Sequence, residues 1–283
     1  MLVYVDDIIV TGNNPTTVKS LVINLNSEFA LKDLGDLDLL SKTAMDEANS
    51  ISSPMVGGCK LTKTGSEDFS DPTLYRSVVG ALQNATITHP EISFFVNKVC
   101  QFMSQPTEQH WVAVKRILRY LKGTLHFGLK LEPNFSTKHY FVHAFCDAEW
   151  ASDPDDRRST SGVAVFLGPN LVSWWSKKQS VVARSSTEAE FRSLALATSE
   201  VTWIQSLLTE LKVPHAPPVI FCDKMSIVSL AHNPFLHSPT KHIELDLFCV
   251  RDKVLSKQLQ VVHVPAAALR ADILTKALSP SNL

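Results

Sequence analysis

Residues 139–151 read HYFVHAFCDAEWA, an apolar stretch that ends at an acidic residue, Asp147. Apolar residues of this kind, followed by polar turn residues, are typical of a buried strand. The stretch PPVIFCDKMS at 217–226 repeats the pattern and places Asp223 after a short apolar strand. In open α/β sheets, functional sites lie where strands end and helices begin. Both aspartates are therefore candidate site residues.

The segments around these two strands alternate between strand and helix patterns. We expect strands at 139–146, 162–167, 171–176, 219–222 and 259–264. We expect helices at 186–211, 223–231, 243–255 and 267–278. This order predicts an α/β fold, a mixed sheet with helices on its faces.

The residues before 133 carry different patterns. Residues 1–40 indicate a hairpin that leads into an amphipathic helix at about 16–29. Residues 41–71 are rich in Ser, Thr, Gly and Lys and predict an irregular linker with a domain boundary. From 71 to 128 the apolar spacing becomes helical and predicts packed helices, one of them at about 108–122.

Composition excludes several classes of protein. The chain has 283 residues, 45% of them hydrophobic, which is enough for a proper core. A net charge of −1 gives no overall attraction to polyanions, so nucleic acid must be bound through local basic patches. The five cysteines are scattered, which disfavours a disulfide scaffold and a zinc site. We expect an intracellular protein, cytoplasmic or nuclear, with no membrane segment and no targeting signal.

Two further acidic residues, Glu190 and Asp272, lie on segments with a helix pattern. Carboxylates crowd together only where cations neutralise them, and Mg²⁺ prefers oxygen ligands. Taken singly, such residues are more often ordinary strand-end or helix-cap residues. Glu188 and Glu190 cannot point the same way from one helix, and either can close the helix start; we favour Glu188 as the capping partner.

Several longer motifs carry a resemblance to a known family. They are FCDAEWASDPDDRRSTSG at 145–162, VSWWSKKQSVVARSSTEAEFRSLA at 172–195, FCDKMS at 221–226, TKHIELD at 240–246 and ADILTK at 271–276. Together they resemble the ribonuclease H domain of copia-type retrotransposon Pol polyproteins. Upstream, YVDDIIVTG at 4–12 resembles the polymerase-site strand of the same elements' reverse transcriptase. SDPTLYRSVVGALQ at 70–83 and WVAVKRILRYLKGT at 111–124 resemble the helical region that joins the two activities.

The resemblance implies a fold and a domain division. It implies a ribonuclease H-like mixed five-stranded sheet with flanking helices at 136–280, preceded by a partial, mostly helical thumb and connection region at 71–132. Residues 1–70 would be a truncated reverse-transcriptase remnant, shortened between 32 and 55, with Asp6 and Asp7 left from the polymerase site. Because a polymerase needs a further metal-binding aspartate on an earlier strand, we expect no polymerase activity.

The resemblance also implies a site and a reaction. Asp147, Glu190, Asp223 and Asp272 would hold two Mg²⁺ ions, with Mn²⁺ as a substitute. Asp147 would bridge both ions. The implied reaction is endonucleolytic, metal-dependent hydrolysis of the RNA strand of RNA:DNA hybrids, without a covalent intermediate.

The partner implied is an RNA:DNA hybrid, together with other proteins encoded by the same element; the oligomeric state is left open. Candidate contacts to the hybrid are Lys177, Lys178, Arg184, Ser185, Ser186 and Thr187. Lys115, Arg116 and Arg119 on the predicted helix 108–122 are further candidates, for which a solvated helix face is the alternative. His263 could assist product departure, although a histidine satisfied in the core is the more common arrangement.

Three departures from the family leave alternatives open. Lys224 follows Asp223 where the family usually has asparagine, Phe248 and Cys249 replace a histidine and an aromatic residue, and the loop 265–269 lacks the usual polar residues. The alternative function is an inactive, decayed or domesticated fragment that binds nucleic acid or a protein. An exonuclease or integrase-like member of the same broad fold is a third interpretation.

Overall fold

The computed structural model describes residues 2–4, 7–9, 15–28, 39–43, 45, 47–132, 140–233 and 244–278. The chain divides into two compact units, Met1–Asp38 and Leu39–Leu283. Among the described residues, none of the helices combines the length and apolar character that a membrane span requires.

The first unit contains a hairpin and a helix. Strands β1 (Leu2–Tyr4) and β2 (Asp7–Ile9) pair antiparallel, with Tyr4 opposite Asp7. Helix α1 (Pro15–Glu28) follows. The predicted hairpin and helix are thus confirmed. Asp7 is the first residue of β2, whereas Asp6 lies outside the described residues.

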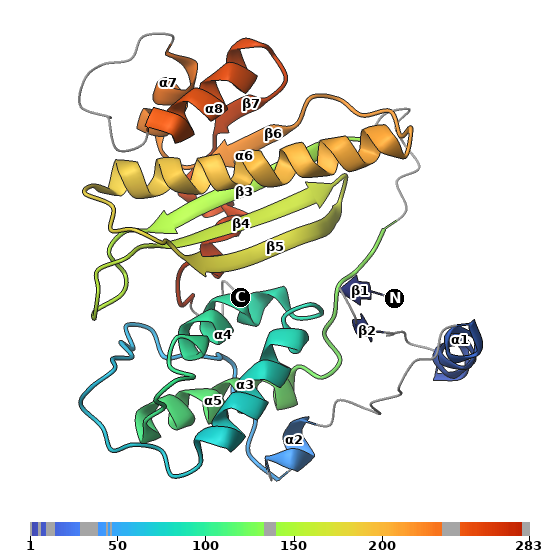
Figure 1. Ribbon diagram of the computed structural model, residues 1–283, viewed down its shortest axis with the longest axis vertical. Helices are drawn as coiled ribbons and strands as arrows, with labels where there is room; N and C mark the ends of the chain where they lie inside the picture. Colours follow the sequence, from blue (N-terminus) through green and yellow to red (C-terminus); the bar gives the residue numbers. More distant parts are fainter. Residues whose placement is uncertain are drawn as a thin grey trace. The chain divides into compact units, whose positions relative to one another are not determined.

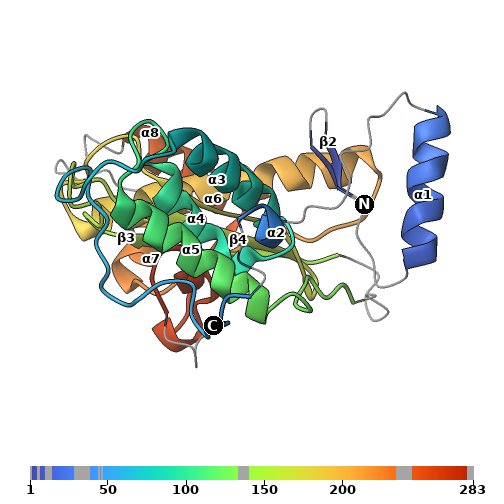
Figure 2. The same cartoon turned by 90° about the horizontal axis from the view of Figure 1, so that it is seen from below.

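The second unit begins with a group of short helices. After α2 (Leu39–Lys42) come α3 (Pro72–Ala85), η1 (Pro90–Ile92), α4 (Ser93–Cys100) and α5 (Glu108–Gly123). Helix α3 starts where the sequence indicates. The Asp71 side chain caps it by accepting a hydrogen bond from Leu74 N at 2.9 Å. Pro72 suits the first turn because proline has no backbone N–H that would need an acceptor there. Figure 2 shows α3, α4 and α5 side by side.

The segment between α2 and α3 is irregular, as predicted, but it is packed. Met55, Leu61 and Phe69 are buried in the same cluster as the helices, and Phe69 stacks on Trp111 with 4.8 Å between ring centroids. The His110 ring lies 3.0 Å from the Thr62 carbonyl and ties the segment to α5. Hydrophobic burial therefore holds this stretch, which its polar composition did not indicate.

The remainder of the second unit is built on a five-stranded sheet (Figure 1). Its strands are β3 (Val142–Glu149), β4 (Thr160–Leu167), β5 (Asn170–Lys178), β6 (Val219–Cys222) and β7 (Gln260–His263). Their order is β5-β4-β3-β6-β7, with the first three antiparallel and with β3, β6 and β7 parallel. The predicted mixed five-stranded sheet is confirmed.

Three helices cover one face of this sheet. They are α6 (Ser186–Glu210), α7 (Met225–His232) and α8 (Glu244–Leu255), and Figure 1 shows α6 running along the sheet. Alternate residues of β3, Val142, Ala144 and Cys146, point into the core that these helices close. The side-chain period of 2 therefore sends Phe145 and Asp147 to the opposite face.

The opposite face is covered by the end of the chain. Phe145, Ala164 and Phe166 pack against Leu269, Ala271 and Leu274. The prediction of a helix at 267–278 is wrong: this stretch forms two short 3-10 helices, η3 (Ala266–Ala268) and η4 (Arg270–Leu274). The buried Leu269 adopts an extended conformation (φ −81°, ψ 96°) between them, so packing against the sheet overrides local helix propensity.

Gly162 of β4 lies so close to η4 that it has no room for a side chain. A Cβ atom at this position would lie 2.7 Å from the Cβ of Leu274 and 2.9 Å from the Cγ2 of Thr275. Gly162 is also the residue paired with Asp147 across the two strands. The missing side chain lets the chain end lie directly beside Asp147.

We expect Gly162→Ala to destabilise the protein by about 1–3 kcal/mol, because the added methyl group overlaps with η4. Gly80→Ala in α3 is the matched control, since a Cβ there meets nothing within 4 Å. Its expected effect is a gain of roughly 1 kcal/mol or less from helix propensity. Urea unfolding measures both, and equal stability of the two variants would refute the close contact.

Candidate metal centre

Three carboxylates from three separate elements meet at one end of the sheet. Asp147 belongs to β3, Glu190 lies in the first turns of α6, and Asp223 directly follows β6. Each offers one oxygen, and these three oxygens lie within 4.8 Å of one another. Asp147, Glu190 and Asp223 form the acidic trio discussed below.

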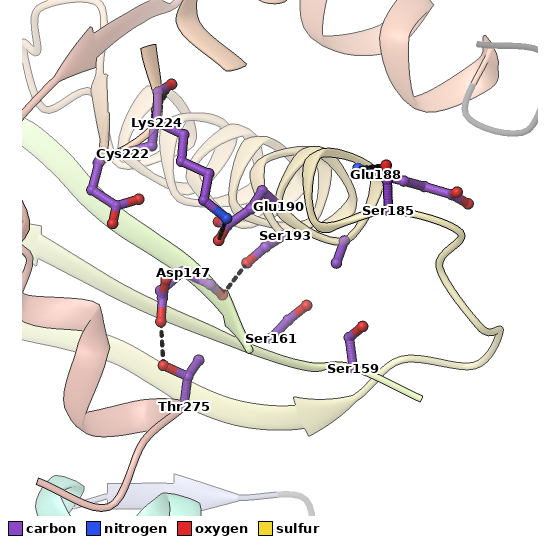
Figure 3. Close-up of polar contacts among 12 residues, drawn as sticks. Asp147, Ser159, Ser161, Ser185, Glu188, Glu190, Ser193, Cys222, Lys224 and Thr275 are labelled. Carbon is purple, nitrogen blue, oxygen red and sulfur yellow. Dashed lines mark hydrogen bonds and ion pairs between the residues drawn. The ribbon is translucent and has the colours of Figure 1, made fainter. Parts of the chain in front are cut away.

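Asp147 is held from both sides of β3. Its side chain is 2% exposed and accepts a hydrogen bond from the hydroxyl of Thr275, which follows η4 (Figure 3). Its main-chain carbonyl accepts a hydrogen bond from Ser193 Oγ in α6 at 2.8 Å. Both the chain end and α6 thus fix the position of this residue.

The start of α6 separates the roles of its two glutamates. Ser185 is the N-cap, and its hydroxyl accepts a hydrogen bond from Glu188 N at 3.1 Å. The Glu188 carboxylate accepts from Arg184 N at 2.8 Å and pairs with Arg192 at 2.9 Å. Ser185 is thus the capping residue, and the Glu188 carboxylate binds the backbone of the residue before it. Glu190, which is 3% exposed, points into the trio instead.

Asp223 has a buried oxygen, Oδ1, that lacks a hydrogen-bond partner among the described residues. Its main-chain carbonyl lies 3.0 Å from the Nε2 of His263 at the end of β7. His263 is exposed, so its expected place in the core is wrong. Because Cys222 pairs in parallel with His263, Asp223 and His263 lie at the same end of their strands.

Two lysines contribute positive charge at the acidic residues. Lys224 Nζ lies 2.7 Å from Glu190 Oε1. Lys276 Nζ lies 3.2 Å from Asp147 Oδ2 and 2.9 Å from Asp272 Oδ1. Asp272, the fourth predicted ligand, stands outside the trio and is joined to Asp147 through this shared ammonium group.

Burial and like charge shift the acidity of these groups. Burial, together with the Asp147 charge, raises the pKa of Glu190 to about 7, although Lys224 opposes the shift. Burial also raises the pKa of Asp272, against the opposing effect of Lys276. For Lys276, burial lowers the pKa, but Asp147 and Asp272 outweigh it and the pKa is raised.

The predicted nucleic-acid contacts lie in different environments. Lys177 is exposed on β5, and its Nζ lies 4.9 Å from the centroid of the Trp175 ring. Lys178 is instead bound by Asp153 at 2.7 Å and Asp156 at 2.8 Å. Asp153 Oδ1 accepts hydrogen bonds from Asp155 N and Asp156 N in a tight turn. Lys178 is the principal counter-ion of this turn, because Arg158 Nε lies a longer 3.6 Å from Asp156 Oδ2.

The remaining predicted contacts divide between two helices. Arg184, Ser185, Ser186 and Thr187 lie at the start of α6, where Ser185 is occupied as the N-cap. On α5, Lys115, Arg116 and Arg119 are half-buried, and Arg119 Nε donates to the Asn49 carbonyl at 2.7 Å. The α5 face is therefore partly covered by the preceding segment.

Four residues at the site were not among the predicted site residues, although Lys224 was noted as a departure from the family. Lys224 and Lys276 contact carboxylates, and Thr275 and Ser193 hold Asp147. A signal was present for two of them: Thr275 and Lys276 follow Asp272 by three and four positions, a spacing that brings side chains together in one helical turn.

Comparisons with known proteins identify relatives of this chain. No protein-family model matches the sequence. The retrovirus-related Pol polyprotein from transposon RE1 of Arabidopsis thaliana is 44% identical over 304 positions, covering 99% of this chain and 20% of the polyprotein. The uncharacterized mitochondrial protein AtMg00810 of the same plant is 40% identical and covers 72% of this chain and 93% of its own length. Among solved structures, the RNase H1 of Halobacterium salinarum NRC-1 is 16% identical with a TM-score of 0.36, covering 47% of this chain and 93% of that one.

The strand order and the helix α6 across one face define an α/β fold of the ribonuclease H type. The chain belongs to the family of retrovirus-related Pol polyproteins of copia-type transposons. It spans about a fifth of the length of the Pol polyproteins that it matches. The alignment with the RE1 polyprotein is longer than the 283 residues of this chain, so that relative contains residues that this chain lacks.

The raised pKa of Glu190 predicts how stability depends on pH. The native state keeps a proton that the unfolded chain loses near its ordinary pKa of 4.5, so the metal-free protein should lose stability as pH rises from about 4.5 to about 7. Glu190→Gln removes this loss. We expect the metal-free variant to be more stable above pH 7 by about 1–3 kcal/mol and to match the unaltered protein at pH 4.

Thermal unfolding in a chelating buffer at several pH values measures this difference. Glu210→Gln is the control, because Glu210 is exposed at the far end of the same helix. A constant difference between Glu190→Gln and the unaltered protein across the pH range would contradict the raised pKa.

Proposed function

We propose that this chain hydrolyses the RNA strand of RNA:DNA hybrids at the acidic trio, with divalent metal ions as cofactors. The observation that carries the proposal is the convergence of Asp147, Glu190 and Asp223, whose oxygens lie within 4.8 Å of one another. These three residues lie far apart in the sequence and come from different elements. Such crowding of like charge is costly unless a cation is bound.

The donor atoms fit Mg²⁺ or Mn²⁺. All three groups of the trio are carboxylates, the hard oxygen ligands that these ions prefer. The buried Oδ1 of Asp223, which lacks a partner among the described residues, is a free ligand position. Asp272 would complete the set through the oxygen that Lys276 now binds. Bound ions would supply a more acidic water and neutralise charge on the scissile phosphate.

The residues around the trio would keep it in place. Asp147 is the central ligand in this proposal, because it lies next to Glu190 and also shares Lys276 with Asp272. Thr275 and Ser193 orient it from the two faces of the sheet. This double support limits the movement of the carboxylate, which favours a fixed ligand geometry.

The substrate would be recognised by shape rather than sequence. Lys177 on β5 and the start of α6 with Arg184 offer positive charge and hydroxyl groups for phosphates and ribose 2′-hydroxyls. The overall charge of −1 predicts weak binding that falls as salt is raised.

A non-catalytic binding module is the second candidate. The ammonium groups of Lys224 and Lys276 favour it, because they contact the acidic residues and supply positive charge that a metal ion would otherwise supply. The family relationship to Pol polyproteins is compatible with both functions.

We expect Asp147→Asn to lower the cleavage of a hybrid labelled on its RNA strand by about a hundredfold or more, because the central ligand loses its charge. Asp252→Asn, on the exposed side of α8, is the matched control and should cleave like the unaltered protein. Cleavage is measured by gel electrophoresis with Mg²⁺ and in the presence of a chelator. Equal turnover by both variants would remove the catalytic role of the trio.

Substitution of Lys177 should affect hybrid binding, whereas substitution of its neighbour Lys178 should affect stability. Lys177→Ala should weaken hybrid binding roughly two- to fivefold and reduce the slope of log affinity against log salt by about 1, because one phosphate contact is lost. Lys178→Ala should instead destabilise the fold by about 1–3 kcal/mol, because it leaves the buried Asp153 without its counter-ion.

Fluorescence anisotropy with a labelled hybrid in chelator measures binding, and urea unfolding measures stability. The assignment of the two lysines would be reversed if Lys178→Ala changed only the salt slope and Lys177→Ala changed only stability.

A further inference from the structure

Lys224 places a positive charge inside the acidic trio. Its Nζ lies 2.7 Å from Glu190 Oε1, and Figure 3 shows the side chain extended toward Glu190. The Glu190 side chain is only 4% exposed, so this contact lies at a desolvated oxygen. Electrostatic interactions at such a place are stronger than at the surface.

The backbone of Lys224 is fixed while its side chain has a route outwards. Lys224 is the N-cap of α7, and its carbonyl accepts hydrogen bonds from Ile227 N at 3.0 Å and Val228 N at 3.3 Å. Its side chain is 34% exposed. The ammonium group can therefore leave Glu190 for solvent by rotation of side-chain bonds alone.

An ammonium and a divalent ion cannot share Glu190 without strong repulsion. A Mg²⁺ ion binds a carboxylate oxygen at about 2.0–2.1 Å, so a metal on either oxygen of Glu190 would lie within a few ångströms of Nζ. Both groups are cations, and the surroundings are poorly solvated. Metal entry at Glu190 therefore requires Lys224 to withdraw.

We propose that Lys224 is an internal competitor of the divalent metal: its ammonium group neutralises Glu190 in the metal-free state and lowers the affinity of the trio for the ion. This inference rests on the site in the proposed function. It adds that the metal-free and metal-bound states differ by the position of one side chain, and that the strength of metal binding is set by a residue that is not itself a ligand.

The formal charges of the site support a competitive role. The trio and Asp272 have four carboxylates, and Lys224 and Lys276 offset two of these charges. Among these six groups two negative charges remain, which a single divalent ion neutralises. A second ion becomes favourable once an ammonium group has left. Lys224 is the better candidate to leave, because it contacts one carboxylate whereas Lys276 bridges two.

Metal binding by substituted proteins tests the proposal without any substrate. Mg²⁺ is titrated by calorimetry into the chelator-treated full chain and into Lys224→Asn and Lys224→Met. Both variants should bind Mg²⁺ about tenfold more tightly than the unaltered protein, because the competing charge is gone. Asparagine is a good N-cap and methionine is a poor one, so agreement between the two variants separates the charge from the capping of α7.

Two controls fix the interpretation. Lys257→Asn makes the same substitution at an exposed residue before β7, at the opposite end of the sheet from Asp223. Asparagine tolerates the positive φ of 59° at this position. It should leave Mg²⁺ affinity unchanged. Lys224→Arg keeps the positive charge and should bind Mg²⁺ no more tightly than the unaltered protein. Unchanged or weaker affinity in both Lys224→Asn and Lys224→Met would overturn the proposal.

Hybrid cleavage measured in parallel separates this inference from the proposed function. If Lys224→Asn and Lys224→Met bind Mg²⁺ more tightly but neither they nor the unaltered protein cleaves a hybrid, competition by Lys224 stands and the nuclease function fails. If the unaltered protein cleaves and both variants keep its Mg²⁺ affinity, the nuclease function stands and competition fails. Asp147→Asn combined with Lys224→Asn should lose the gain in affinity, which places the bound ion at the trio.

Discussion

Electrostatic neutralisation of buried carboxylates is the constraint on which the rest of this structure depends. Asp147 and Glu190 are almost fully buried, and an oxygen of Asp223 is enclosed beside them. Negative groups this close repel one another strongly where water is excluded. Two ammonium groups, from Lys224 and Lys276, reduce that repulsion in the described structure. Burial, together with the Asp147 charge, still raises the pKa of Glu190 to about 7.

The fold delivers these groups from both faces of one sheet. Helix α6 brings Glu190 from one side, whereas η4 and the residues after it bring Thr275 and Lys276 from the other. Asp147 lies between them at the end of β3 and is bound from both directions. The absence of a side chain at Gly162 is what allows the chain end to come this close. The site therefore depends on packing on both faces of the sheet, so a change in either layer would move its ligands.

Family membership and local chemistry describe different aspects of this chain. Its similarity to copia-type Pol polyproteins covers 99% of the chain and so includes both the sheet and the helical region before it. The charge balance at the site depends on individual residues such as Lys224, which directly follows one member of the trio and contacts another. Side-chain contacts of this kind set how strongly a metal is held, even where the backbone is that of the family.

The sequence alone determined the strands β3 to β7 and the helices α6 to α8, because apolar periodicity is a local property. It also pointed to Asp147, Glu190 and Asp223 through motifs that resemble a known family. Only the tertiary structure decided that the last segment forms 3-10 turns, that Asp272 binds Lys276 outside the trio, and that Lys178 is an internal counter-ion. These features arise from contacts between residues distant in the sequence, such as Gly162 with Leu274 or Lys224 with Glu190, and local patterns contain no record of such contacts.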